Sequence, residues 1–133
     1  MYMLDTNICI YVLKNRSDAL RHKFKAIKNL CISSVTYGEL CFGIENSSDS
    51  VKKARWEQLD LFSQRLTIEA WDEDAARHYG FIRALLKKHG TPIGNNDLLI
   101  AAHARSMNAV LVSNCLPEFE RVPDLSLENW TTA

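Results

Sequence analysis

Residues 93–114 read IGNNDLLIAAHARSMNAVLVSN and decide the fold class. The NNDLLIAAHARSM segment, residues 95–107, predicts a helix that is opened by an asparagine cap. The AVLVSN segment, residues 109–114, is an unbroken apolar run of the kind that forms a strand buried on both faces. A helix that leads directly into such a strand is typical of a parallel sheet covered by helices.

The rest of the chain repeats this alternation. Short strands are predicted at MYMLD, LCISSV, RLTIE and LSLENW, the last as an edge strand. Helices are predicted between them, at ICIYVLKN and at about residues 17–29, 36–46, 51–63 and 72–90. We therefore predict an α/β protein, a single-domain α/β/α sandwich with a central, mostly parallel sheet.

The composition is that of one compact domain spanning residues 1–133. Apolar residues make up 47% of the chain and charged residues 24%, which is enough to bury a core without disulfides or structural zinc. The four cysteines form no C-x-x-C pair, which favours a reducing compartment. Because no stretch resembles a signal peptide or a membrane span, we predict a cytoplasmic protein with no membrane attachment.

The net charge is zero, but its distribution is uneven. The first 30 residues carry six lysines or arginines, including Lys14 and Arg16, against two acids. Such a basic flank could hold a phosphate backbone beside an acidic pocket. It could equally be the solvated face of an amphipathic helix, and the charge pattern alone leaves both open.

Three carboxylates lie near the boundaries between predicted strands and helices. Asp5 ends MYMLD, Glu39 lies one turn into the helix after LCISSV, and Asp97 opens the helix before AVLVSN. The carboxyl ends of parallel strands meet at one edge of a sheet, where α/β proteins bind ligands. Hard divalent cations need several oxygen ligands. This convergence favours an acidic metal site.

Each carboxylate also has a purely structural explanation. Asp5 could cap a helix, Thr36 and Glu39 could form a T-x-x-E capping box, and Asp97 could complement a helix dipole. These explanations account for the acids one at a time. They do not account for all three acids at the same edge.

Other chemistries lack sequence support. The histidines form no H-E-x-x-H string, no G-x-S-x-G elbow is present, and no glycine loop for phosphates occurs. The tryptophans are predicted as core anchors because they do not cluster with basic residues. The histidines are predicted to lie on helix surfaces: His22, His78, His89 and His103.

The segments MLDTNICIYVLKNR, ISSVTYGEL, IGNNDLLIAAHA and LVSNCLPEFERVPDL occur in an order and spacing that resemble the PIN-domain ribonucleases, and closely resemble the VapC toxins of bacterial toxin–antitoxin pairs. The resemblance spans nearly the whole chain. It implies a PIN-like fold, a homodimer and inhibition by a VapB-type antitoxin in a toxin–antitoxin hetero-oligomer. It also implies Mg²⁺- or Mn²⁺-dependent cleavage of structured RNA, with tRNA, and initiator tRNA in particular, as the favoured target.

The resemblance also assigns site residues. Asp5, Glu39 and Asp97 would bind metal, with Glu118 as a fourth catalytic acid. The remaining matches have supporting roles: Thr6 and Asn7 beside the first acid, and Asn96 and Asn114 as neighbouring oxygen or amide donors.

One position departs from the family pattern. Cys115 follows Ser113-Asn114 where relatives usually carry an amide or a carboxylate. Because a thiol is a poor ligand for a hard ion, a second metal would depend on Glu118 and water. With one ion, or with two about 4 Å apart, activated water would cleave the phosphodiester and leave 5′-phosphate and 3′-hydroxyl ends.

Two rival functions remain open from the sequence. A phosphatase of the haloacid dehalogenase type also places an aspartate after its first strand. Such an enzyme needs a D-x-D motif, and in this chain Asn7 occupies the position of the second aspartate. A catalytically weakened module that acts mainly as an antitoxin-binding co-regulator is the second rival, and Cys115 is the feature that supports it.

Overall fold

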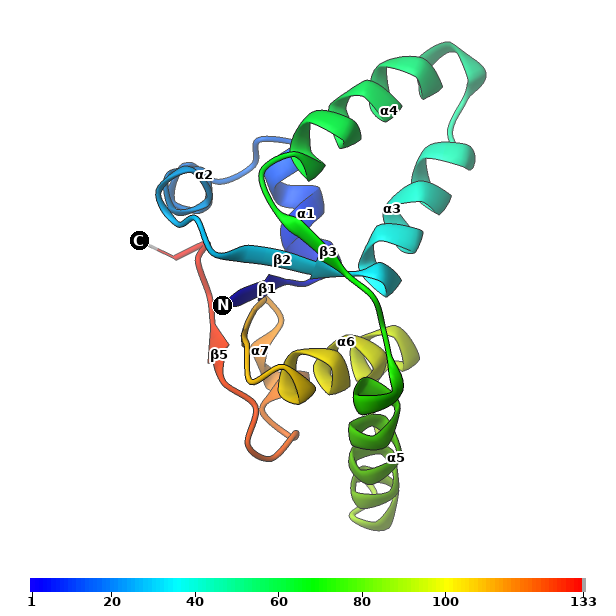
Figure 1. The fold of residues 1–133 in the computed structure, drawn as a ribbon, viewed down its shortest axis with the longest axis vertical. Coiled ribbons are helices and arrows are strands. Elements are labelled where there is room, and N and C mark those ends of the chain that lie inside the picture. The colour runs from blue at the N-terminus through cyan, green and yellow to red at the C-terminus, as the bar shows by residue number, and fades with distance from the viewer. Residues whose placement is uncertain (133) are drawn as a thin grey trace.

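The computed structural model describes residues 1–132 as one α/β unit (Figure 1). The strands are β1 (Tyr2–Leu4), β2 (Leu30–Ser33), β3 (Thr67–Glu69), β4 (Val110–Val112) and β5 (Leu127–Glu128). The helices are α1 (Thr6–Leu13), α2 (Asp18–Ala26), α3 (Ser34–Glu45), α4 (Asp49–Ser63), α5 (Glu73–Lys88), α6 (Asn95–Ser106) and α7 (Leu116–Phe119).

The strands form one sheet in the order β3-β2-β1-β4-β5, and every pair is parallel. Met3 pairs with Cys31 on one side of β1 and with Leu111 on the other. The three central strands therefore end at nearly the same level. The predicted mostly parallel sheet is confirmed.

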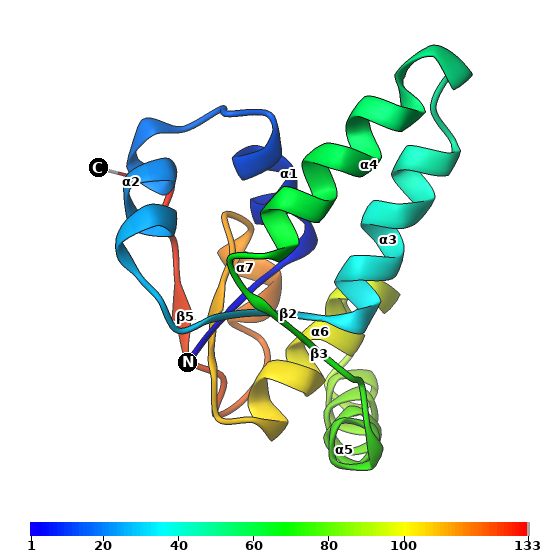
Figure 2. The ribbon, with the colours of Figure 1, turned by 45° about the horizontal axis from the view of Figure 1, so that its top comes forward.

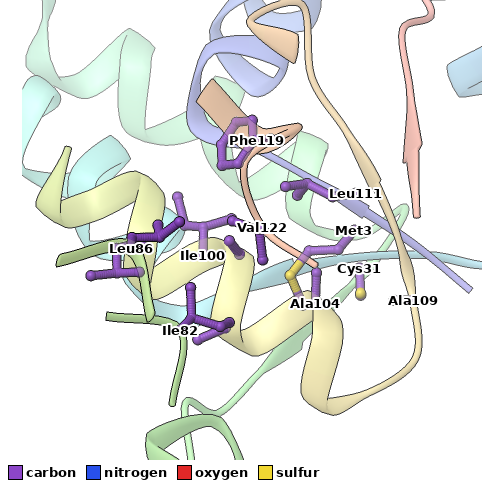
Figure 3. Close-up of a cluster of buried hydrophobic side chains, with 13 residues drawn as sticks. Met3, Cys31, Ile82, Leu86, Ile100, Ala104, Ala109, Leu111, Phe119 and Val122 are labelled. Atoms are coloured by element: carbon purple, nitrogen blue, oxygen red, sulfur yellow. The ribbon is translucent and has the colours of Figure 1, made fainter. Parts of the chain in front are cut away.

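Helices cover both faces of the sheet, and side-chain alternation along the strands explains why. Met3 and Leu111 point into a core with α5, α6 and α7 (Figure 3). Leu4 and Val112, one residue further along each strand, point into a second core with α1 to α4. The predicted α/β/α sandwich is confirmed, and Figure 2 shows α3 and α4 side by side as a hairpin on one face.

The predicted start of α3 and the predicted cap of α6 are wrong. Helix α3 begins at Ser34, because the Ser33 side chain accepts the Val35 N–H at 3.1 Å and caps the helix. Thr36 is buried inside the helix, so no T-x-x-E capping box forms. Helix α6 has Gly94 as its N-cap with no side-chain bond, rather than an asparagine cap.

Two further features differ from the sequence-based expectation. The one-turn helix α7 was not predicted, because four residues are too few for a periodic apolar pattern. His103 is buried rather than on a helix surface, because α6 is packed between the sheet and α5 and has few exposed positions. Within residues 1–132, no helix is long and apolar enough to cross a membrane.

Candidate functional site

Asp5 lies where β1 ends and α1 begins. It is almost completely buried, and its Oδ1 accepts the Ile8 N–H at 2.8 Å, so it does cap α1. Burial raises the pKa of Asp5, the bonds from Ser113 and Ile8 lower it, and the charge of Glu39 raises it again. The capping role and a place in an acidic site therefore coexist in one side chain.

Glu39 faces the same edge from α3. Its Oε1 accepts a hydrogen bond from Thr6 Oγ1 at 2.7 Å, and its Oε2 accepts one from Asn96 Nδ2 at 2.8 Å. Thr6 Oγ1 also lies 3.3 Å from Thr36 Oγ1. Thr6 was expected to support Asp5, but its hydroxyl bonds to Glu39 instead, because the first residue of α1 faces α3.

Asp97 is half-buried in the first turn of α6, close to Glu118 of α7. Burial, then the hydrogen bond and charge of Glu118, and then the charges of Asp5 and Glu39, raise the pKa of Asp97 to about 7. The four predicted acids thus act on one another, and we call Asp5, Glu39, Asp97 and Glu118 the acid cluster.

Of Asn7, Lys14 and Arg16, which were also predicted from the sequence, the first two line hollows beside Glu39. Asn7 is exposed and lines an open hollow of about 630 Å³ together with Glu39 and Asn96. Lys14 lines a second hollow, of about 380 Å³, that also reaches Glu39. Arg16 lies 5.9 Å above the Tyr11 ring and lines neither hollow.

The residues after β4 complete the edge. Ser113, which the sequence analysis did not single out, hydrogen-bonds the buried Asp5; its signal was its place as the last residue before Asn114. Asn114 Oδ1 is buried and has no partner among the described residues. Cys115 is exposed, and its backbone N–H donates to Ser113 Oγ at 2.9 Å.

These residues suit a hard divalent ion. The donors in the acid cluster are all oxygens, and a divalent cation would offset the burial and the neighbouring carboxyl groups that raise the pKa of Asp97. Within residues 1–132, no three acids, histidines or cysteines form a ready-made cage. Mg²⁺ is usually held by one or two carboxylates and several waters, so a closed cage is not required. The unpartnered Asn114 Oδ1 adds a further free oxygen.

The fold and the acid cluster define a class: α/β proteins with an oxygen-rich acidic site at the carboxyl edge of a parallel sheet. Comparisons narrow this class. The sequence model of the PIN domain matches residues 2–125. The chain therefore belongs to the PIN domain family. Within that family, it is similar over nearly its full length to proteins named VapC.

Two curated relatives and one solved structure illustrate the match. The chain is 46% identical over 130 residues to "Ribonuclease VapC2" of Haemophilus influenzae, covering 97% of each chain. It is 42% identical to "tRNA(fMet)-specific endonuclease VapC" of Salmonella typhimurium, again over 97% of each. The structure of VapBC2 from Rickettsia felis, bound to a DNA fragment from its promoter, superimposes with a TM-score of 0.91 at 40% identity, covering 97% of this chain and 98% of that one.

Proposed function

We propose that this protein is the toxin of a toxin–antitoxin pair and acts as a Mg²⁺- or Mn²⁺-dependent endoribonuclease in the cytoplasm. The observation that carries the proposal is the acid cluster, in which burial and then the neighbouring carboxyl groups raise the pKa of Asp97 to about 7. Initiator tRNA is the favoured substrate, because relatives at 42% and 41% identity are named tRNA(fMet)-specific endonucleases. Cleavage of that tRNA would inhibit translation.

The chain's own residues have distinct tasks in this reaction. Asp5, Asp97 and Glu39 would hold the ion, with Glu118 and Asn114 as further oxygen donors. Thr6 and Asn96 fix the Glu39 carboxylate by one bond to each oxygen. A bound divalent ion lowers the pKa of its water and stabilises charge on the phosphate. Glu118, which lies close to Asp97, would be suited to move a proton at the leaving 3′ oxygen.

The RNA backbone would approach over the hollows beside Glu39. Asn7 and Asn96 line one hollow, and Lys14 and Arg55 line the other. Two cations next to the cluster offset its negative charge toward a polyanion. Arg16, which lines neither hollow, would contribute only through the wider basic flank.

A VapB-type antitoxin and a second copy of the chain are the proposed protein partners. The solved relatives from Rickettsia felis and Salmonella typhimurium are VapBC complexes bound to DNA. The hollow between α1, α3 and α4 is walled by apolar residues such as Leu40, Ile44 and Leu59 and ends at Glu39. A partner segment seated there would block the acid cluster, which provides a direct route to inhibition.

The test compares the wild type with Asp97→Asn on total tRNA, with Mg²⁺, with Mn²⁺ and with EDTA. Asp49→Asn is the matched control, because Asp49 is an exposed acid at the start of α4, outside the acid cluster. Metal-dependent cuts made by wild type and control but not by Asp97→Asn support the proposal. Intact tRNA in every lane, from folded protein without antitoxin, would contradict it.

The rival functions are distinguished by two further measurements, hydrolysis of small phosphoesters and growth arrest on expression. A haloacid dehalogenase-type phosphatase would hydrolyse small phosphoesters and leave RNA intact. An antitoxin-binding module without catalysis would not arrest growth when expressed alone. Replacing Cys115, which is exposed, with asparagine would restore cleavage if the thiol alone weakens the site.

A further inference from the structure

A buried polar pair outside the acid cluster connects the helices that carry it. His103 of α6 is 1% exposed and Ser33, at the end of β2, is fully buried. His103 Nδ1 lies 2.8 Å from Ser33 Oγ. A buried imidazole is costly unless it is hydrogen-bonded, and the neighbours of His103 along α6 are the small apolar Ala102 and Ala104. Nothing in the proposed chemistry uses this histidine.

The position of His103 along α6 relates it to the site. Asn96 and His103 are seven residues apart, so they lie on the same face of the helix, separated by about 10 Å. Asn96 bonds to Glu39 inside α3, and His103 bonds to Ser33 at the start of α3. Helix α6 is therefore attached to α3 at two levels, and one of the two attachments is part of the candidate site.

A third connection joins the same elements at the Ser33 end. The Trp71 backbone N–H donates to Ser34 Oγ at 3.1 Å, and its indole Nε1–H donates to the Leu99 carbonyl at 3.0 Å. The start of α3 is thus bonded to α6 directly through His103 and indirectly through Trp71. Polar bonds of this kind fix orientation more strictly than apolar contacts, because they are directional.

We propose that His103 is a positioning residue, whose bond to Ser33 fixes the orientation of α6 against α3 and so keeps Asn96 on Glu39 and Asp97 in the acid cluster. Without the bond of His103 to Ser33, one direct bond between α6 and α3 would remain, at Asn96, and the orientation of α6 would depend on the indirect connection through Trp71 and on apolar packing. With two direct bonds about 10 Å apart, rotation of α6 about either bond is opposed. The inference deepens the proposed function and rests on it for its metal-binding readout.

The protonation chemistry of the pair is consistent with this role. Burial lowers the pKa of His103, although the charges of Asp72 and Glu69 act in the opposite direction. Ser33 Oγ already accepts the Val35 N–H, which leaves it one hydrogen and one lone pair. It can therefore bond to either tautomer of a neutral imidazole.

The test uses variants that separate the bond from the bulk of the side chain. His103→Asn places an amide nitrogen near the position of Nδ1 and retains a bond to Ser33. His103→Leu removes the bond, and His103→Gln places its amide near Nε2, out of reach of Ser33, in case leucine prevents folding. Leu20→Ala is the control, because Leu20 is buried in α2, in the core on the other face of the sheet, and its truncation lowers stability without touching α6.

The first readout is the side-chain amide signal of Asn96 in ¹⁵N-labelled, metal-free protein, assigned with Asn96→Asp. We expect His103→Leu and His103→Gln to shift this signal and to speed its hydrogen exchange at least roughly tenfold, as expected for loss of one hydrogen bond. His103→Asn and Leu20→Ala should leave the signal in place. An unchanged Asn96 signal in folded His103→Leu or His103→Gln, or an equal shift in Leu20→Ala, would overturn the proposal.

The second readout is Mn²⁺ affinity, measured by electron paramagnetic resonance. Loss of a supporting contact at a metal site typically weakens metal binding 10- to 100-fold, so about tenfold weaker binding is expected for His103→Leu and near-wild-type binding for His103→Asn. A wild type that binds no Mn²⁺ would contradict the proposed function instead. The Asn96 signal would still decide the role of His103.

Discussion

The two halves of the acid cluster are stabilised in opposite ways. Glu39 receives one hydrogen bond on each carboxylate oxygen, from Thr6 and Asn96. Asp97 instead lies against a second carboxyl group, Glu118, and its pKa is raised to about 7. Both carboxylate oxygens of Glu39 therefore have hydrogen-bond donors without a metal ion. Asp97 needs a proton or a cation to offset the charge of Glu118. This difference indicates where a divalent ion would contribute most free energy.

The largest expected effect comes from removing the Asp97 carboxylate. Asp97→Asn should weaken Mn²⁺ binding by more than about 100-fold, because it deletes a ligand rather than a supporting contact. Glu118→Gln should weaken it less, by roughly tenfold. Calorimetric titration of both variants measures the two losses. Equal losses would mean that the ion does not distinguish the two carboxyl groups.

Ion binding should stabilise the fold. At a Mg²⁺ concentration about 100 times the dissociation constant, the linkage free energy is about 2.7 kcal/mol, or on the order of 10 °C in Tm for a domain of this size. Scanning calorimetry with and without Mg²⁺ measures the shift. Asp97→Asn serves as the control, and its Tm should rise little when Mg²⁺ is added. A wild-type Tm that does not change with Mg²⁺ would argue against an ion site.

Without metal, the Asp97 half should make the fold less stable as pH rises. The pKa of Asp97 is raised from 3.8 to about 7, so its contribution is fully present below pH 4 and is lost as pH rises through 7. His103 has the opposite sign, because its lowered pKa gives stability that is lost as pH falls.

The difference in Tm between the wild type and Asp97→Asn isolates the carboxyl group, since His103 is common to both proteins. In EDTA, the stability of the wild type relative to the variant should fall between about pH 4 and pH 7. A difference that stays constant with pH would show that the pKa of Asp97 is not raised in the folded protein.

The smallest effect is expected in the Glu39 half. Thr6→Val keeps the shape of the side chain but removes the donor to Glu39, so cleavage should fall by about tenfold at limiting metal and recover partly at high metal. The free energy of unfolding should change by only about 1 kcal/mol. Thr131→Val, in the C-terminal segment, is a matched control that should leave cleavage unchanged.

The sequence predicted the elements with strong patterns. The unbroken apolar run at Val110–Val112 and the acids placed after β1 and at the start of α6 were sufficient to place Asp5 and Asp97 at one edge of the sheet. Strand ends and side-chain types are local information, so they can be read from the chain. The assignment of these acids to catalysis remains a prediction.

Other features depended on contacts between distant segments. Glu39 and Thr36 match a capping box locally, but Thr6, more than 30 residues earlier, bonds to Glu39 instead. His103 looks like a surface histidine on a helix, and only its packing against Ser33, 70 residues away, shows that it is buried. Contacts of this kind between distant segments override local patterns, and they cannot be identified from a single sequence.

The most direct test of the central claim is proton release when Mg²⁺ binds. Calorimetric titrations at pH 6.5 and 8.5, each in two buffers of different ionisation enthalpy, give the number of protons displaced. Because the pKa of Asp97 is raised to about 7, an ion that binds there should displace its proton, so protons should be released at pH 6.5, far fewer at pH 8.5, and almost none in Asp97→Asn at either pH. Mg²⁺ binding without proton release at pH 6.5, or no binding at all, would contradict the account.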